Sequence, residues 1–375
     1  MKKEILFRNI RFLKSLKRSF QFSLSSWSES RYLYQFEEAD HLGIFFDNKI
    51  KSTEILESAP YPIMVSSGLG LSIIKGNKIH NLLSTPPGFY VFGVASSNKR
   101  IYITINFHMP IKSNINNLIK KRITLLVSAK ISDIIAAIKN NQYLVNWHTH
   151  LIDRNKSYSY LNYYDSSLYA ADYLGSIDVF KIDEKNNESF RKIKSLDLLK
   201  SNLHYPNYFY PYLHMNCVSV DERNIYCGLH AYSKITKYKS SLYRIEKSSG
   251  SIALERDTNF VSAHDLMKVN DDFYGCDSDN GKLFRNNDCI FQSNQKSFFR
   301  GLSINKNGFV LGSSIYSKRR SQREKPNSNN KILFLDKDGS LLSTLTPNFS
   351  SIYRIFSLGK TELSQSSSVN IMRNI

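Results

Sequence analysis

The sequence predicts an all-β protein: a β-propeller of six blades, with seven as the alternative, preceded by a short basic N-terminal helix. Between residues 213 and 358 one arrangement repeats about three times: an apolar segment carrying polar residues, a turn, and a strand rich in small residues. The polar heads of successive units are His214, His264, Arg300 and Arg354, at intervals of 50, 36 and 54 residues. Four short strands per unit at a period of about 40 to 50 residues are typical of propeller blades.

The later strands of these units have recognisable ends. Small-residue strands are expected at residues 224–228, 272–276 and 308–312. Gly250 and Gly339 follow two further strands and tolerate the positive φ that a tight turn requires. Residues 277–281 (Asp-Ser-Asp-Asn-Gly) are interpreted as a hairpin turn, because they lack the register and the terminal Glu of an EF-hand calcium loop.

The first part of the chain repeats less regularly. We expect strands at residues 43–46, 63–66, 71–74 and 79–83, the last two around a Gly76-Asn77 turn, and a hairpin of 89–94 with 101–107. A short helix is expected at 132–138, capped by Ser132 or Asp133.

One further unit is expected over residues 146–200, with its second strand at 168–170 and its third at 176–182. The polar stretch 186–202 is placed between repeats. Residues 351–358 look like the start of a unit that never continues. A last strand that joins the first blade would close the ring and hide its edges.

The chain is expected to divide into three segments. Residues 1–31 form a basic amphipathic extension, 40–358 the propeller, and 359–375 a Ser-rich disordered tail. The apolar stripe of the extension either docks on its own domain or lies on an anionic membrane or polyanion. Residues 318–330 are interpreted as a solvated basic loop, with phosphate binding as the alternative.

The charge balance favours an anionic partner. Among 375 residues, 51 Lys and Arg face 32 Asp and Glu, giving a net charge of +19. Nucleic acid, an acidic membrane surface or a charged glycan would suit this charge. The alternative is compositional bias, because AT-rich coding also enriches Lys, Asn, Ile, Ser and Tyr.

A cytoplasmic location is expected, with peripheral membrane contact through the basic segments as an alternative. The basic N-terminus lacks the apolar stretch of a secretory signal, and no apolar run is long enough for a transmembrane segment. The four cysteines show no C-x-x-C spacing, which is typical of buried thiols in a reducing compartment.

The candidate site lies at the heads of the innermost strands, which converge at one mouth of a propeller channel. We expect an anionic small molecule or glycan to bind there, held by guanidinium groups. The ligand-binding candidates are His214, Asn216, His264, Asp265, Arg300 and Arg354. An aromatic stretch at residues 205–212 is either a sugar-stacking platform or packing between blades.

Metal-assisted catalysis is an alternative use of the same residues. His148 and His150 have i, i+2 spacing, so in a strand both rings face one side, and with His214 and His264 they would offer four nitrogens to a divalent metal ion. A hydrolase or lyase would use His264, Asp265 and His214 as catalytic groups. A protein–protein scaffold with purely structural inner residues is the third hypothesis.

The unit heads His-x-Asn, His-Asp and Arg-Gly-Leu, with the turn at residues 277–283, resemble bacterial β-propellers of unknown function. More distantly, residues 146–358 resemble the gluconolactonase-like and strictosidine-synthase-like propellers. That resemblance implies six blades and, in the enzymes of the superfamily, a central cation held by Glu, Asn and Asp. No such ligand set is assigned to residues of this chain.

Overall fold

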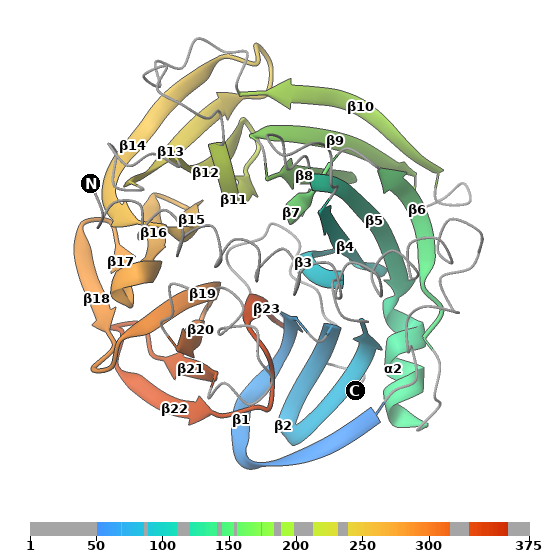
Figure 1. Cartoon of the computed structure of the whole chain (residues 1–375), viewed down its shortest axis with the longest axis vertical. Helices are drawn as coiled ribbons and strands as arrows, with labels where there is room; N and C mark the ends of the chain where they lie inside the picture. The colour runs from blue at the N-terminus through green and yellow to red at the C-terminus, as the bar shows by residue number, and fades with distance from the viewer. Residues whose placement is uncertain are drawn as a thin grey trace, which may run out of the picture.

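The computed structural model describes residues 51–68, 70–85, 89–110, 120–140, 145–153, 156–173, 175–183, 189–198, 213–231, 239–315 and 330–358. These residues form six antiparallel sheets arranged around one axis, as Figure 1 shows. The predicted six-bladed β-propeller is therefore confirmed.

Five blades are four-stranded meanders whose strands follow in chain order. Blade 2 holds β3 (Phe89–Ser96), β4 (Arg100–Pro110), β5 (Lys120–Lys130) and β6 (His148–Asp153). Blade 3 holds β7 (Tyr158–Tyr164), β8 (Ser167–Asp172), β9 (Ser176–Asp183) and β10 (Ser189–Asp197). Blade 4 holds β11 (Leu213–Val220), β12 (Asn224–Ala231), β13 (Lys239–Glu246) and β14 (Ile252–Val261). Blade 5 holds β15 (His264–Val269), β16 (Asp272–Asp277), β17 (Lys282–Arg285) and β18 (Asp288–Gln292). Blade 6 holds β19 (Ser297–Asn305), β20 (Gly308–Ile315), β21 (Lys331–Leu335) and β22 (Leu341–Leu345).

Blade 1 joins the two ends of the ring. It contains β1 (Lys51–Ser67), β2 (Gly70–Ser84) and, as its innermost strand, β23 (Ile352–Ser357). β23 pairs antiparallel with residues 63–67 of β1, so the predicted closing strand is confirmed. β2 folds back at Gly76, whose φ is +58°, and Ser72 Oγ donates a hydrogen bond of 2.7 Å to Asn81 Oδ1 across the turn. The turn predicted at Gly76-Asn77 is thus present.

Strands buried between two neighbouring blades are apolar on both faces. Residues 101–105 of β4, Ile-Tyr-Ile-Thr-Ile, are all buried, as expected for a strand covered on both sides by other sheets. Outermost strands differ, and β14 mixes exposed and half-buried positions along most of its length. Strands covered on both faces therefore leave a clearer apolar signal in the sequence than the outermost strands do.

Three expectations about element boundaries were wrong. The stretch at 189–197 is β10, the fourth strand of blade 3, because outer strands tolerate polar residues on an exposed face. β6 completes blade 2, so the unit expected to begin near residue 146 begins at β7 instead. Helix α2 (Ile131–Lys139) has Lys130 as its N-cap residue without a side-chain cap, because Ile131 is buried and its N–H donates to the Lys99 carbonyl.

The turn expected at residues 277–281 joins β16 to β17 and is confirmed as a hairpin turn. Gly281 has a φ of +61° after a short 3₁₀ turn. The Asp277 carboxylate accepts hydrogen bonds from the Val261 N–H and from the Asn280 side chain, so it closes the turn itself.

Several predicted features lie outside the described residues. They are the extension at 1–31, the strand at 43–46, the aromatic stretch at 205–212, the basic residues at 318–329 and the tail at 359–375. Within the described ranges, no helix is long and apolar enough to cross a bilayer. The described cysteines are free thiols, and Cys217, Cys227 and Cys276 are buried while Cys289 is exposed.

A buried carboxylate links the inner strand of blade 3 to its outer strands. Asp178 is fully buried and accepts hydrogen bonds from the Tyr158 hydroxyl (2.5 Å), Lys192 Nζ (2.8 Å) and Ser195 Oγ (2.5 Å). Burial alone would raise the pKa of Asp178, but the three donors outweigh it and lower the pKa below its usual range. Burial and the Asp178 carboxylate raise the pKa of Tyr158.

This network predicts a specific acid sensitivity. A carboxyl whose folded pKa is lowered contributes stability above its unfolded pKa of about 3.9, and that stability is lost as the pH falls through the lower folded value. We expect Asp178→Asn to cost about 1–3 kcal/mol at neutral pH and to flatten the loss of stability below about pH 4. Urea midpoints measured from pH 7 to 2 test this, with the exposed Asp288→Asn as the control. An Asp178→Asn profile parallel to that of the wild type would contradict it.

Candidate functional site

The heads of the six inner strands lie at one end of the ring. Because each full blade has four antiparallel strands, the chain leaves a blade at the same end where it enters the next one. The inner strands β3, β7, β11, β15, β19 and β23 therefore run in the same direction along the axis. The sequence prediction that the unit heads converge at one mouth is consistent with this topology.

Each inner strand carries a bulge near its head. The pairing register with the next strand shifts at Val91/Val94, Tyr158/Tyr160, Met215/Cys217, His264/Met267, Arg300/Leu302 and, on β1 opposite β23, Ser66/Ser67. A bulge bends the strand and re-aims side chains. Asp265 (φ +55°) and Gly301 (φ +78°) adopt the left-handed conformation at these bulges. The predicted site residues lie at or beside these irregular positions.

Asp265 and Arg354 form an ion pair inside the ring. Arg354 Nη1 lies 3.1 Å from Asp265 Oδ1, and the two side chains are each 3% exposed. Asp265 Oδ2 accepts the N–H groups of Gly301 (2.8 Å) and Leu302 (3.1 Å), and Arg354 donates to the Leu302 carbonyl at 3.0 Å. Burial raises the pKa of Asp265, while the Arg354 charge and the two N–H groups act in the opposite direction.

This ion pair connects four blades. Asp265 belongs to blade 5, Gly301 and Leu302 to blade 6, and Arg354 to the closing strand of blade 1. The Arg354 guanidinium also lies 4.4 Å from the centroid of the Tyr160 ring of blade 3, a cation–π contact. The pair therefore acts as a structural link around the axis.

Asn216 forms a similar link between blades. Its side-chain N–H donates to the Ala263 carbonyl at 2.5 Å, which joins blade 4 to blade 5. Asn216 is 7% exposed. The structure therefore places Asn216, Asp265 and Arg354 near the axis, and each forms at least one hydrogen bond to a neighbouring blade.

His214, His264 and Arg300 lie toward the mouth among aromatic rings. The imidazole centroids of His214 and His264 are 6.2 Å apart, and the Tyr173 ring lies 3.9 Å from that of His214. His264 Nδ1 lies 2.9 Å from both the Ser262 carbonyl and Ser278 Oγ, which fixes the orientation of its ring.

Arg300 of blade 6 lies over aromatic rings of blades 1 and 2. Its guanidinium carbon is 4.7 Å from the Tyr353 ring centroid and 5.7 Å from that of Phe92. Phe92 in turn packs on Tyr353 at 4.6 Å and on Tyr90 at 5.7 Å. Such stacking holds a guanidinium plane in place, and the N–H groups at the edge of that plane are the ones that contact an anion.

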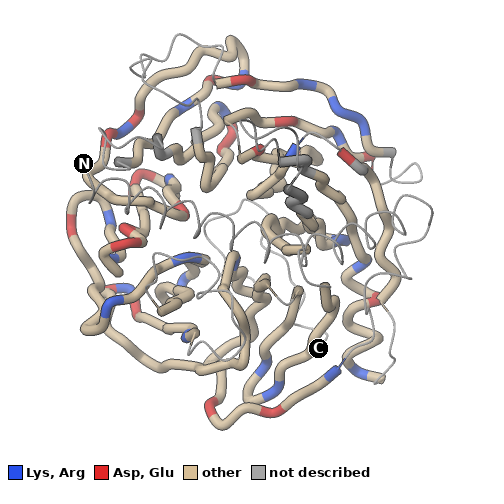
Figure 2. The backbone as a smooth tube through the Cα atoms, viewed as in Figure 1, with Lys and Arg blue, Asp and Glu red and all other residues tan. Residues whose placement is uncertain are grey.

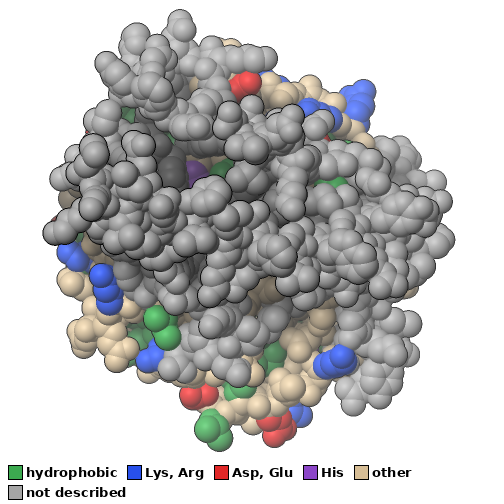
Figure 3. Space-filling model, in the orientation of Figure 1, with side chains coloured by type: hydrophobic (Ala, Val, Ile, Leu, Met, Phe, Trp, Pro, Cys, Tyr) green, Lys and Arg blue, Asp and Glu red, His purple; other side chains and the backbone are tan. Residues whose placement is uncertain are grey.

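These residues form a continuous arc, here called the aromatic belt. Following the ring from blade 2 through blades 1, 6, 5 and 4 to blade 3, its members are Tyr90, Phe92, Tyr353, Arg300, Phe298, His264, His214 and Tyr173. Phe92, Tyr353, Phe298 and His264 are buried, whereas Tyr90, Arg300, His214 and Tyr173 are partly exposed. A histidine side chain is visible on the face shown in Figure 3. All six blades contribute to the belt.

The structure does not bring the two histidine pairs together. His148 and His150 lie on β6, the outermost strand of blade 2, with ring centroids 4.8 Å apart on one face as the i, i+2 spacing predicts. His150 Nε2 lies 2.8 Å from Ser128 Oγ, and its ring stacks on Phe190. His214 and His264 are on inner strands of blades 4 and 5. Within the described part of the chain, no three His, Cys, Asp or Glu side chains gather around a position for a metal ion.

Sequence reasoning missed most of the aromatic members. Tyr353 lies beside the predicted unit head Arg354 but was not included in the site, and neither were Tyr90, Phe92, Tyr173 and Phe298. A signal was available, because Tyr90/Phe92 and Phe298/Arg300 have i, i+2 spacing at the start of inner strands and therefore share a face.

Comparisons with known proteins add a likeness of shape. No protein-family model matches the sequence, and no curated protein matches it significantly. A chain of the nidogen/laminin complex is 12% identical, with a TM-score of 0.49 over 81% of this chain and 99% of that chain. The computationally designed Ika8 protein is 10% identical, with a TM-score of 0.40 over 86% of this chain and 95% of that one. A structural-genomics protein of unknown function from Bacteroides thetaiotaomicron is 11% identical, with a TM-score of 0.40 over 86% and 84%. At such identities and TM-scores, none of them bears on ligand, partner or activity.

Proposed function

We propose that this propeller is a binding protein for an acidic glycan, which it takes up at the aromatic belt. The observation that carries the proposal is the composition of the partly exposed belt members: two tyrosines, one imidazole and one guanidinium, contributed by four blades. Sugar rings stack on the apolar face of tyrosine, while hydroxyl and carboxylate groups of the same ligand need polar partners.

Arg300 is the residue that selects for negative charge. A guanidinium binds a carboxylate through two parallel hydrogen bonds, and such charge-assisted bonds are about twice as strong as neutral ones. Stacking on Tyr353 and Phe92 holds the guanidinium plane before the ligand arrives, which reduces the entropy lost on binding. Arg354 is paired with Asp265, and the Arg300 charge also acts to lower the pKa of that carboxyl.

The geometry supports binding better than catalysis. Asp265, the predicted acid or base, is 2% exposed and bonded to Arg354 and two backbone N–H groups, so it does not face a substrate. A divalent metal ion, the other route to a hydrolase or lyase, would need ligands that the described residues do not gather in one place.

Removal of the Arg300 guanidinium should abolish the preference for acidic over neutral oligosaccharides. We expect wild-type protein to bind uronic-acid oligosaccharides in titration calorimetry and to bind neutral oligosaccharides of equal length more weakly. Arg300→Ala should weaken binding of the acidic ligands by about tenfold to a hundredfold, the value of a charge-assisted hydrogen bond. Binding of the neutral ligands should change little.

The matched control is Arg223→Ala, which removes an exposed arginine from the turn between β11 and β12 at the opposite end of the ring. It should leave the affinity for acidic ligands unchanged. Equal binding by wild type and Arg300→Ala, or no affinity for acidic oligosaccharides at all, would overturn the proposal.

A further inference from the structure

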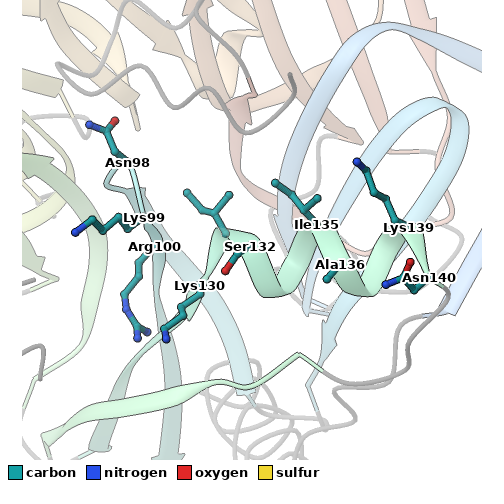
Figure 4. Close-up of a pocket in the computed structure, with 10 residues that line it drawn as sticks. Asn98, Lys99, Arg100, Lys130, Ser132, Ile135, Ala136, Lys139 and Asn140 are labelled. Carbon is teal, nitrogen blue, oxygen red and sulfur yellow. The ribbon is translucent and has the colours of Figure 1, made fainter. Parts of the chain in front are cut away.

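A second concave surface lies at the end of the ring opposite the aromatic belt. A cavity of about 680 Å³ opens between helix α2 and the turn that joins β3 to β4, as shown in Figure 4. Because the inner strand β3 starts at the belt, the turn at its far end lies away from the belt. The two surfaces are therefore separated by the length of the inner strands.

The cavity combines an aliphatic floor with a cationic rim. One side of α2 supplies the floor through Ile131, Ile135 and Ala136. The exposed cationic residues of the lining are Lys99, Lys130 and Lys139, whereas Arg100 is buried and donates to Ser128 Oγ at 2.9 Å. None of the described residues that line the cavity is acidic. Lys130 and Lys139 stand at the two ends of α2, which Figure 2 shows as basic positions at either end of the helix.

A smaller cavity extends the basic surface. It has a volume of about 400 Å³ and shares Lys139, with Lys75, Lys78 and His80 contributed by the folded-back strand β2. Burial lowers the pKa of His80, and the positive charges of Lys78 and Lys75 lower it further. Glu54 is opposite Lys78 in the strand register and is exposed outside both cavities.

The local sequence explains why this surface exists. Ile134 and Ala137 are buried against the propeller and anchor α2 across the end of blade 2. Residues 131, 135 and 139 lie along another side of the helix at i, i+4 spacing, so this side is left facing the β3–β4 turn. Ile131 also belongs to the buried core and Ile135 packs partly against it. The charges of the three exposed lysines around the opening are not required to anchor the helix.

We infer that this α2 groove, defined by the exposed Lys99, Lys130 and Lys139 around Ile131 and Ile135, docks an acidic segment of a partner protein. The segment carries carboxylates on both sides of an aliphatic anchor, which matches a cationic rim around an aliphatic floor. Nucleic acid fits less well, because the floor offers no aromatic ring for base stacking. A membrane fits less well, because the aliphatic groups are recessed and the exposed large hydrophobic residues lie elsewhere.

The groove and the belt would act independently. A glycan bound at one end of the ring and a protein segment at the other would make this chain an adaptor between a carbohydrate and an acidic protein. The inference about the groove stands whether or not the belt binds a glycan, since the two surfaces share no residue.

Selection from a peptide library tests the inference while the partner is still unidentified. The full chain is used to select from displayed 12-residue random peptides, with the Lys130→Glu/Lys139→Glu variant present as a soluble competitor. We expect enriched peptides to carry Asp or Glu on both sides of Leu, Ile or Val. The tightest peptide is then measured by fluorescence anisotropy against each variant, and circular dichroism checks that each variant is folded.

The control keeps the same change in net charge at the same end of the ring. Lys306→Glu/Lys337→Glu reverses two exposed lysines in the turns β19–β20 and β21–β22. We expect the groove variant to bind about tenfold more weakly and the control variant to bind like the wild type. Ile135→Ser, which removes part of the floor without changing the charge, should also weaken binding.

Three outcomes would overturn the inference. Enriched peptides without carboxylates would show that the rim does not select charge. Equal loss in the control variant would assign the affinity to the overall charge of +19 rather than to the groove. Unchanged affinity in Ile135→Ser, together with equal binding of a peptide whose aliphatic residues are replaced by serine, would remove the role of the floor.

Discussion

Arg354→Met is expected to lower the free energy of unfolding by about 3–5 kcal/mol, because it leaves the buried Asp265 carboxylate without its counter-charge. Asp265 retains the N–H groups of Gly301 and Leu302, which are too few to replace water around a carboxylate at 2% exposure. The substitution keeps a long apolar side chain near Tyr160, so the effect reports charge more than lost volume. Urea unfolding of both proteins at neutral pH measures the difference.

A double-mutant cycle separates the ion pair from its surroundings. Asp265→Asn preserves an acceptor for the two N–H groups, and asparagine tolerates the φ of +55° at this position. The double variant Arg354→Met/Asp265→Asn buries no charge, so it should recover about 1–2 kcal/mol relative to the sum of the single variants. Strictly additive effects would show that the two side chains do not stabilise each other.

Removal of the closing strand should abolish the folded ring. A chain ending at residue 350 lacks β23, all six of whose residues are buried, and with it the inner strand of blade 1 and Arg354. The apolar faces of blades 1, 2 and 6 that β23 covers would then be exposed to water. We expect this chain to be aggregated or to lack a cooperative thermal transition.

The matched control for this truncation is a chain ending at residue 358. It removes the Ser-rich stretch 359–375, which the sequence predicts to be a tail outside the propeller, so it should keep the transition temperature of the full chain to within about 2 °C. Cooperative unfolding of the shorter chain at the same temperature as the control would contradict the role of β23 in closure.

The architecture was predictable because every propeller blade needs an inner strand that is buried on both faces. Each inner strand is covered on both faces, so its residues are apolar at a period that the sequence shows between His214 and Arg354. The closing role of β23 followed from the same reasoning. A single strand after the last blade has no further strands of its own to pair with, so it was expected to pair with the first blade. The outer strand β10 was not found, because an exposed strand carries polar residues that resemble a loop.

The positions of Asn216, Asp265 and Arg354 at strand heads were predictable, but the partners of their polar atoms were not. The sequence places Asn216, Asp265 and Arg354 at strand heads, but it does not show the bulges that turn these side chains toward the next blade. Bulge positions depend on backbone pairing between distant strands, which has no local signature apart from Gly301. For the same reason, the aromatic belt appears only when six separate strand heads are placed around one axis.

The most direct test of the binding account is an electron-density map of the protein crystallised with a uronic-acid oligosaccharide. We predict sugar density across Tyr90, His214 and Tyr173, with a carboxylate held by the guanidinium edge of Arg300. Density for the oligosaccharide at any other surface, with the belt free of ligand, would contradict it.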